Sequence, residues 1–572
     1  MSQEHIHRLD GRIFGDPGAD GMVHRAFLRA EGFSAEQVRR RPIIGIATSW
    51  SELNPCNFGF RDLAASVKKG VEAAGGLALE FPTISINEPF SRPSSMYLRN
   101  LLSMDVEEMV LASPIDGVVL LGACDKTVPA VLMGAISAGT PAILVTGGPR
   151  PVACWKGKLT TVDEQWEIID QRRVGELSDE DWEAFEGVIH GGPGSCNVMG
   201  TATTMAAIGE LLGFALPGSS LASAVAPERQ EIAEASGRLM VDVVSRGVVP
   251  RERITIESLE NAVRMVCALG GSTNALIHLE AIAGRAGIRI GWDRMREWSE
   301  TTPFITDVKP NGRAMLSELD EVGGIPAVAA QIRHLLHEDV PTVDGRTWGE
   351  VFDGVPARVI GGPIADPAEP LTPDGGMAVV RGSLAPNGAV MKIAGAASSM
   401  RKHRGKAVVF DGVADMWSKI DDDALEVDEH SVLVLRGVGV TGGPGIPEVG
   451  HVPIPAKLFK AGVTDMLRVT DARMSGTSSG SVVLHVSPEA AAGGPLAYVR
   501  DGDEIELDVE AGRLDLLVSP EELAKREPAI VGIERPRRGW GLLYAEHALQ
   551  PDQGCDFDFL VDEELRAKEA TA

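Results

Sequence analysis

The sequence contains little cysteine and no long uninterrupted apolar run. Six cysteines in 572 residues are too few for a disulfide scaffold, so we expect reduced thiols in a cytoplasmic protein. Residues 1–16 are polar and lack the apolar segment of a secretion signal. The longest mainly apolar stretch, 206–226, is interrupted by Glu210 and Pro217, so no membrane-spanning helix is predicted there.

Basic residues are also scarce relative to acidic ones. There are 54 Lys and Arg residues against 81 Asp and Glu residues, which gives a formal net charge of −27. Such a surface repels phosphate backbones and anionic lipids, so neither nucleic acid nor a membrane is an expected partner. A small anionic substrate would need a local cation, either basic side chains or a bound metal.

Two patterns of apolar residues divide the chain. In the first two-thirds, short apolar runs at 43–47, 117–121 and 142–145 alternate with helix-like runs, which predicts an α/β domain with a mostly parallel sheet. A Pro- and Gly-rich interval at 361–376 ends this pattern. Beyond it, turn residues separate short strands, which are expected at 407–410, 431–436, 466–470, 481–486, 504–509 and 513–518. We therefore predict an α/β domain, 1–370, and a β-barrel-like domain, 371–572.

Three cysteines share a local setting. Cys56, Cys124 and Cys196 each precede a helix-like run, at a predicted corner between a strand and a helix. Such corners lie at the carboxyl edge of a parallel sheet, where α/β proteins bind ligands. The free N–H groups at the start of a helix also stabilise a thiolate. Three converging thiolates suit a metal or iron–sulfur centre with one open position, although each cysteine could instead be a small buried apolar residue. The cysteines outside this pattern are predicted not to be ligands: Cys154, Cys267 and Cys555.

Oxygen ligands are predicted beside the same site. Asp125 and Lys126 follow Cys124 directly, and Glu88 and Glu448 lie next to prolines in apolar or Gly-rich loops. Mg²⁺ requires hard oxygen ligands and keeps positions open for substrate oxygens, and it would supply the positive charge that an anionic substrate needs. Taken singly, Glu88 and Glu448 fit helix caps or solvated loop acids at least as well.

A stretch of small residues, 471–480, is predicted to join two strands of the second domain. Its glycines and serines allow backbone N–H groups to face a ligand and leave the Ser475 and Thr477 hydroxyls exposed. Ser475 is a candidate base if neighbouring donors or a metal stabilise its alkoxide. On spacing alone, a flexible hairpin turn or an anion-binding nest without a catalytic role is favoured.

Residues 437–442 match the glycine pattern of dinucleotide-binding proteins and follow a predicted strand. Pro444 and Pro447 prevent the helix whose N-terminus would receive a pyrophosphate. An NAD(P)-dependent sugar-acid oxidoreductase is therefore only a remote alternative.

The motifs that carry chemistry occur in a fixed order along nearly the whole chain: PCN (55–57), GACDKTVPA (122–130), GSCNVMGTATTM (194–205), GGSTNA (270–275), DVKPNG (307–312), GGPGIPE (442–448) and TDARMSGTSSG (470–480). This ordered set resembles the dihydroxy-acid and sugar-acid dehydratase family, which includes 6-phosphogluconate dehydratase. Residues 84–105 and 547–560 look like the arabinonate/xylonate dehydratase branch. The C-terminal segment is expected either to reach a neighbouring subunit's site or to be acidic and solvated.

The resemblance implies an iron–sulfur cluster and Mg²⁺ in an active site between the two domains. The three cysteines named above would bind the cluster, and the branch favours [2Fe–2S] over [4Fe–4S]. The family's Mg²⁺ ligands correspond here to Glu88, Asp125, Lys126 and Glu448, with Lys126 expected as a carbamate.

The resemblance also implies the reaction. Ser475 takes the place of the general base that removes the C2 proton, and Thr477 is a neighbouring hydroxyl that helps hold the substrate. We expect dehydration of a sugar acid, such as L-arabinonate or D-xylonate, to its 2-keto-3-deoxy acid by a homodimer or homotetramer. The alternatives are a dihydroxy-acid dehydratase of branched-chain amino-acid biosynthesis and a non-catalytic metal-binding scaffold.

Overall fold

A four-stranded parallel sheet forms the centre of the N-terminal half. The computed structural model describes residues 14–356, 361–563, 565 and 566. The sheet has the order β2 (Leu77–Pro82), β1 (Ile43–Thr48), β3 (Gly117–Gly122), β4 (Ala142–Thr146). Strands β1, β3 and β4 lie where the sequence predicted them and are buried along their whole length. The prediction missed β2, an edge strand that alternates between partly buried and exposed residues over most of its length.

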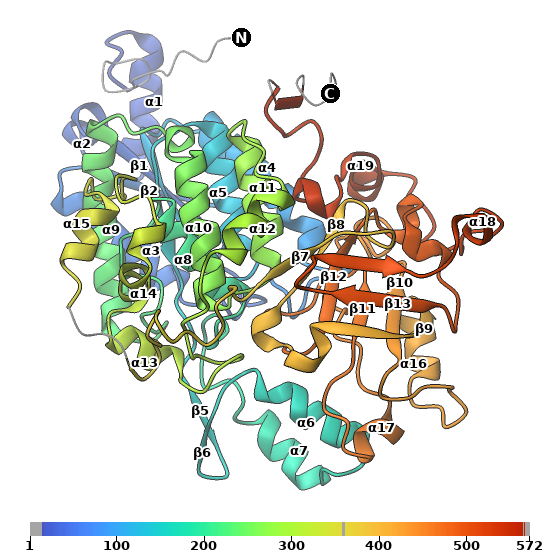
Figure 1. Cartoon of the computed structure of the whole chain (residues 1–572). Helices are drawn as coiled ribbons and strands as arrows, with labels where there is room; N and C mark the ends of the chain where they lie inside the picture. Colours follow the sequence, from blue (N-terminus) through green and yellow to red (C-terminus); the bar gives the residue numbers. More distant parts are fainter. Residues whose placement is uncertain (1–13, 357–360, 564, 567–572) are drawn as a thin grey trace.

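Helices cover both faces of this sheet (Figure 1). On one face, Ile44 and Ile46 pack with side chains of α3 (Phe60–Ala73) and α9 (Pro227–Ser245). On the other, Val118 and Leu120 pack with α4 (Met96–Ala112) and α5 (Thr127–Ala138). A further layer of buried helices comprises α8 (Thr201–Leu211), α10 (Ile256–Leu269) and α11 (Asn274–Arg285); α8 and α11 pack on α5, and α10 packs on α8 and α11. This burial of both faces explains why the strands read as continuous apolar runs.

The C-terminal half contains an eight-stranded mixed sheet that curls into a nearly closed barrel. Its order is β14 (Arg513–Leu516), β13 (Glu504–Asp508), β9 (Lys402–Asp411), β10 (Val432–Arg436), β11 (Arg468–Thr470), β12 (Val482–Ser487), β8 (Gly388–Met391), β7 (Ala378–Val380). Strands β9 to β12 are parallel, and their outer neighbours are antiparallel. A bridge between Arg381 and Arg513 joins the two edges, with Arg381 N donating to Gly512 O at 2.9 Å. The predicted α/β and β-barrel-like classes are therefore confirmed.

A segment of the N-terminal half extends over to the C-terminal half. Residues 153–189, here called the arm, comprise the hairpin β5 (Ala153–Trp155) and β6 (Lys158–Thr160), then α6 (Glu164–Arg173) and α7 (Asp179–Glu186). The arm has a small apolar core of its own around Ile168 and Phe185. Figure 1 shows α6 and α7 near α17 (Ala456–Lys460), and Arg173 Nη2 donates to Ile454 O at 2.7 Å. Nothing in the sequence patterns predicted this arm.

Residues 554–557, near the end of the described chain, are held inside the molecule. Arg285 on α11 pairs with Asp556, with Nε and Oδ2 at 2.6 Å, and both side chains are buried. Arg99 on α4 donates to Gly554 O and Cys555 O at 2.9 and 2.8 Å. The expectation of an acidic solvated segment is wrong for residues 554–557, because Arg285 compensates the carboxylate of Asp556 and allows it to be buried.

The other helices surround these two halves. They are α1 (Ala19–Ala30), α2 (Ala35–Arg40), α12 (Trp292–Glu300), α13 (Leu316–Glu321), α14 (Gly324–Gln331), α15 (Trp348–Asp353), α16 (Val413–Lys419), α18 (Pro520–Leu523) and α19 (Gly539–His547). Within the described ranges, no helix combines the length and the apolar character that crossing a bilayer requires.

Candidate functional site

The three predicted cysteines lie at the carboxyl edge of the parallel sheet. Cys56 lies in the loop between β1 and α3, and Cys124 in the loop between β3 and α5; both are buried. Cys196 precedes α8 and is half-buried. The strand predicted before Cys196 is reduced to a single β-bridge between Ser195 and Pro149, because residues 191–194 are glycines and a proline. The sequence therefore predicted this corner correctly in position but not in its secondary structure.

The thiols of these cysteines lie close enough to influence one another. The Cys124 thiol shares a hydrogen bond with Cys56, which together with burial raises the pKa of Cys124 well above its usual value. Burial raises the pKa of Cys196 to about 12, and the negative charge of Asp125 acts in the same direction. Three thiols converge here next to a carboxylate, a setting that favours a bound cationic centre over free thiolates.

The predicted acids meet around Lys126. Oxygen atoms of Glu88, Asp125 and Glu448 all lie within 4.8 Å of one another. The Lys126 ammonium, which is fully buried, lies 2.9 Å from Glu88 Oε2, 2.9 Å from Glu448 Oε1 and 3.5 Å from Asp125 Oδ2. These four residues come from three separate loops, two in the N-terminal half and one after β10 in the C-terminal half. The alternatives of helix caps and solvated loop acids are wrong for Glu88 and Glu448.

Electrostatic interactions within this cluster are strong because it is buried. Burial raises the pKa of Asp125 to about 6, helped by Glu448 and Glu88 and opposed by Lys126. Burial opposes ionisation of Glu88 as well, but Lys126 and Arg473 outweigh it and lower the pKa of Glu88 to about 2. Burial likewise opposes the charge on Lys126, yet the three carboxylates hold the pKa of its amine above the usual value. The carboxylates are thus arranged to share one central cation.

Two residues that were not predicted as site residues complete the cluster. Arg473 is fully buried, with Nη1 2.6 Å from Glu448 Oε1 and Nη2 3.8 Å from Glu88 Oε1. Asn274, at the start of α11, donates from Nδ2 to Glu448 Oε1 at 3.0 Å, and its Oδ1 has no hydrogen-bond partner among the described residues. Both lie inside motifs quoted above, so motif membership was the only sequence signal for them.

The segment with Ser475 is a crossover between parallel strands. It connects β11 to β12, which pair in parallel, so the hairpin-turn alternative is wrong. Gly476 packs on the start of α8, where an added Cβ would lie 2.5 Å from Thr201 N. Asn274 Nδ2 also contacts Thr201 Oγ1 at 3.0 Å and Met474 O at 3.3 Å. The segment therefore lies between the acid cluster and the helix that follows Cys196.

The hydroxyls of Ser475 and Thr477 contact each other. Ser475 Oγ and Thr477 Oγ1 are 2.8 Å apart, and Thr477 N donates to Ser475 Oγ at 3.3 Å. Lys392, which is fully buried, donates from Nζ to Gly476 O at 3.3 Å and fixes the backbone between them. Burial lowers the pKa of Lys392 to about 7. The half-buried Ser475 thus lies in a loop whose backbone is held by Lys392 and packed against the start of α8.

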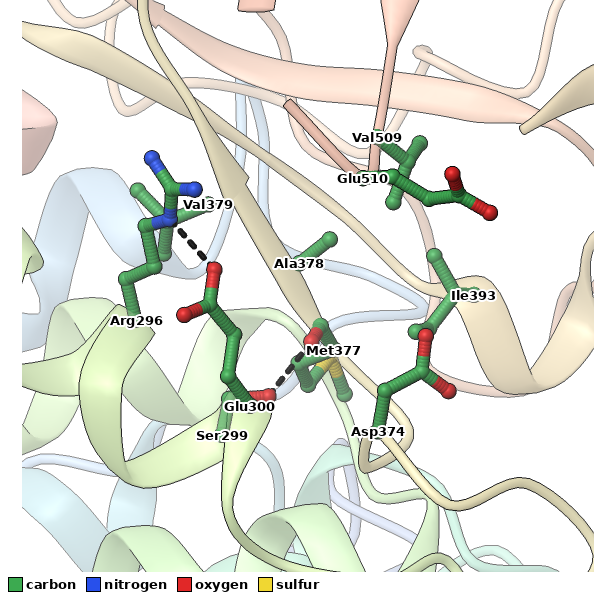
Figure 2. Close-up of a pocket in the computed structure, with 10 residues that line it drawn as sticks. All are labelled: Arg296, Ser299, Glu300, Asp374, Met377, Ala378, Val379, Ile393, Val509 and Glu510. Atoms are coloured by element: carbon green, nitrogen blue, oxygen red, sulfur yellow. Dashed lines mark hydrogen bonds and ion pairs between the residues drawn. The ribbon is translucent and has the colours of Figure 1, made fainter. Parts of the chain in front are cut away.

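Two other regions contain none of these site residues. The glycine pattern 437–442, which precedes the loop of Glu448 and is fully described, forms turns and bends without a helix, as Pro444 and Pro447 predicted. A hollow of about 220 Å³ lies between α12, β7 and the connection from β13 to β14. Figure 2 shows its wall, where Arg296 Nε pairs with Glu300 Oε1 at 2.6 Å. None of the residues lining this hollow is a predicted site residue.

Comparisons with known proteins cover almost the whole chain. Residues 41–351 match the family model described as dihydroxy-acid/6-phosphogluconate dehydratase N-terminal, and residues 363–555 match the corresponding C-terminal model. An L-arabonate dehydratase of Azospirillum brasilense is 44% identical over 562 residues, 96% of each chain. An L-arabinonate dehydratase of Rhizobium leguminosarum bv. trifolii is 42% identical over 556 residues, 96% of this chain and 95% of the other. A 6-deoxy-6-sulfo-D-gluconate dehydratase of Pseudomonas putida is 41% identical over 571 residues, 98% of each chain.

Proposed function

The chain belongs to the dihydroxy-acid/6-phosphogluconate dehydratase family and is a hydro-lyase, and we propose that it dehydrates a sugar acid to the 2-keto-3-deoxy acid. The substrate class we propose is an aldonate such as L-arabinonate or D-xylonate. The observation that carries the proposal is the buried cluster of three carboxylates around Lys126, which Asn274 connects to the Ser475 segment. Relatives named for sugar acids at 41–44% identity support the substrate class.

The residues present fit both cofactors that the family implies. Cys56, Cys124 and Cys196 would hold an iron–sulfur cluster, for which we propose [2Fe–2S]. Their convergence beside Asp125, where burial disfavours a free thiolate, supports an iron–sulfur site, and the resemblance to the arabinonate/xylonate branch favours [2Fe–2S].

A magnesium ion fits the neighbouring acids. Glu88, Asp125, Glu448 and a carbamate on Lys126 would hold Mg²⁺, and the unpartnered Oδ1 of Asn274 lies in the same polar region. Among the described residues, three carboxylates here face two cationic side chains, Lys126 and Arg473, and a carbamate would replace the positive charge of Lys126 by a negative one, so negative charge remains for a divalent cation. When bound, the two groups would supply Lewis acidity to the substrate's carboxylate and hydroxyl oxygens.

The chain's own contribution is the movement of the C2 proton. Ser475 Oγ, as an alkoxide, would take this proton, and the electron pair of the C2–H bond would become the second bond between C2 and C3. As this double bond forms, the bond between C3 and its hydroxyl oxygen breaks. The hydroxide leaves as water after it has received one proton, which balances the proton taken from C2. The resulting enol tautomerises to the keto acid, so substrate equals product plus water and no electron acceptor is needed.

An activity panel tests this proposal. The purified protein, kept anaerobic with Mg²⁺ and without added nucleotide, is assayed for 2-keto acid formation from pentonates, hexonates and 2,3-dihydroxyisovalerate. We expect the highest kcat/KM with one of the sugar acids. A higher kcat/KM for 2,3-dihydroxyisovalerate would overturn the substrate class, and absence of product from every acid would overturn the activity.

We also propose that the protein is a homodimer or homotetramer. Met22, Val23 and Phe27 on α1 are 45–69% exposed, and an apolar surface of this kind supports contact with a second copy. Sedimentation equilibrium gives the mass directly, and a monomer at micromolar concentration would contradict the proposal.

A further inference from the structure

The hydroxyl pair of Ser475 and Thr477 has a third member that comes from the arm. Trp166, in the first turn of α6, donates from its indole Nε1 to Thr477 Oγ1 at 2.9 Å. Thr477 Oγ1 is in turn 2.8 Å from Ser475 Oγ. Trp166 and Ser475 are thus connected by two consecutive hydrogen bonds between residues more than 300 positions apart in the sequence.

The chemistry of the indole gives this chain of bonds a direction. An indole N–H only donates, so Thr477 Oγ1 must be the acceptor of the bond from Trp166. The single hydrogen of the Thr477 hydroxyl then remains available for Ser475. When Ser475 is an alkoxide, its oxygen can only accept hydrogen bonds, so the hydroxyl hydrogen of Thr477 must point toward it. The backbone N–H of Thr477 already donates to Ser475 Oγ, with N and Oγ 3.3 Å apart. Consecutive hydrogen bonds polarise one another, which strengthens the donation to the alkoxide.

The position of Trp166 is fixed by contacts on both sides of α6. Glu164, two residues earlier, pairs with Lys309 of the N-terminal half. Arg173, at the end of the helix, pairs with Asp421 Oδ1 at 2.5 Å and donates to Ile454 O in the C-terminal half. The Trp166 ring also lies 6.0 Å from the ring of His451, measured between centroids. The indole donor is therefore held against Thr477 by contacts that the arm makes with both halves.

We propose that Trp166 is a positioning residue for the dehydration: through Thr477 it holds a hydrogen-bond donor on the Ser475 alkoxide, so that a residue of the arm completes the base. This inference rests on the proposed function, because it assumes that Ser475 removes the C2 proton.

Replacement of one indole by a phenyl ring tests the role of the donor. In Trp166→Phe an aromatic ring remains and the N–H is lost, so we expect kcat to fall about tenfold with KM within about twofold of wild type. With C2-deuterated substrate, the isotope effect on kcat should increase, because proton abstraction becomes slower than the other steps. Unchanged kcat and an unchanged isotope effect would overturn the inference.

Trp155→Phe is the matched control. Trp155 lies in the same arm and packs against Phe185, with ring centroids 5.1 Å apart, but its Nε1 has no hydrogen-bond partner among the described residues. We expect its kcat and isotope effect to stay within about twofold of wild type. An equal loss in Trp155→Phe would mean that the arm's packing, and not the Trp166 donor, controls the rate, and would overturn the inference.

A double-mutant cycle with Thr477→Val tests whether Trp166 acts through Thr477. Valine keeps the shape of threonine without the hydroxyl, so Trp166→Phe should cause little further loss of kcat in a Thr477→Val background. Thr477→Ser, which restores a hydroxyl, should recover most of the sensitivity to Trp166→Phe. Fully multiplicative losses would show that Trp166 acts by another route.

Failure of this inference and failure of the proposed function give different results. If Ser475→Ala retains turnover, the assignment of the base is wrong whatever the Trp166 variants do. If Ser475→Ala abolishes turnover but Trp166→Phe behaves like wild type, only the role of Trp166 is wrong. Circular dichroism and the visible absorption of the cluster establish that each variant is folded and loaded.

Discussion

Asn274 Nδ2 donates to Glu448 Oε1 at 3.0 Å, so a helix of the N-terminal half holds a carboxylate that belongs to the C-terminal half. The same Nδ2 contacts Met474 O at 3.3 Å, one residue before Ser475. One amide therefore fixes the distance between the proposed magnesium ligands and the proposed base. Residues of this kind, which orient ligands without binding the metal, are often as important as the ligands themselves.

The first prediction concerns this amide. Asn274→Asp replaces a donor by a carboxylate beside Glu448, so we expect Mg²⁺ affinity to fall about 10- to 100-fold. Calorimetric titration of the purified protein with Mg²⁺ measures this change. Asn261→Asp is the control, because Asn261 is also buried but its Nδ2 donates to His337 O at 3.0 Å. An unchanged affinity in Asn274→Asp would contradict the proposed role of Glu448 as a ligand.

The second prediction concerns the cluster ligands. Cys56→Ser, Cys124→Ser and Cys196→Ser should each lower the iron and sulfide content, because a serine oxygen is a poorer ligand for iron–sulfur clusters than a thiolate. Anaerobic iron and sulfide analysis measures the loss. Cys267→Ser, a change of another buried cysteine on α10, should keep full content. A full complement of iron in any of the first three variants would remove that cysteine from the ligand set.

The third prediction concerns pH and Lys392. Burial lowers the pKa of this lysine to about 7 in the folded protein, from 10.5. Between pH 7 and 10.5 the unfolded chain therefore binds more protons at this site, so the free energy of unfolding rises with pH by up to about 1.4 kcal/mol per unit. Below pH 7 the cost of burying the charge is fully present. In Lys392→Met, the free energy of unfolding should lack this contribution to the pH dependence.

Urea unfolding of wild type and Lys392→Met at several values between pH 6 and 10 measures the difference. Contributions from the other titrating groups largely cancel between the two proteins. We expect the free energy of unfolding of the wild type to rise relative to that of Lys392→Met as the pH rises. A difference independent of pH would show that Lys392 keeps its charge in the folded protein, held by Gly476 O.

The fourth prediction concerns the buried pair of Arg285 and Asp556. Arg285→Met leaves the Asp556 carboxylate buried without its cation, so we expect the free energy of unfolding to fall by about 3–5 kcal/mol. The double variant Arg285→Met with Asp556→Leu should recover part of this loss, since no uncompensated charge remains. Urea unfolding measures both. A loss in the double variant equal to that in Arg285→Met would show that packing, and not charge, explains the effect.

The sequence by itself determined the local features of this protein. Strands β1, β3, β4 and β9 to β14 follow from runs of apolar residues bounded by turn residues, a pattern that depends only on near neighbours. The same local reasoning placed Cys56 and Cys124 at the ends of strands, and the two prolines after residue 442 excluded a nucleotide-binding helix. Motif order and spacing then predicted the family, which the comparisons confirmed.

Only the tertiary structure decided which distant residues meet. The contact of Asn274 with Glu448, of Arg473 with Glu88 and of Trp166 with Thr477 joins segments that the chain separates by 174, 385 and 311 positions. No local pattern encodes such a distance, because it is set by how helices and sheets pack and not by the side chains next to each residue. For the same physical reason the 471–480 segment proved to lie in a crossover and residues 554–557 proved to be buried, although their local sequences suggested a hairpin and a solvated tail.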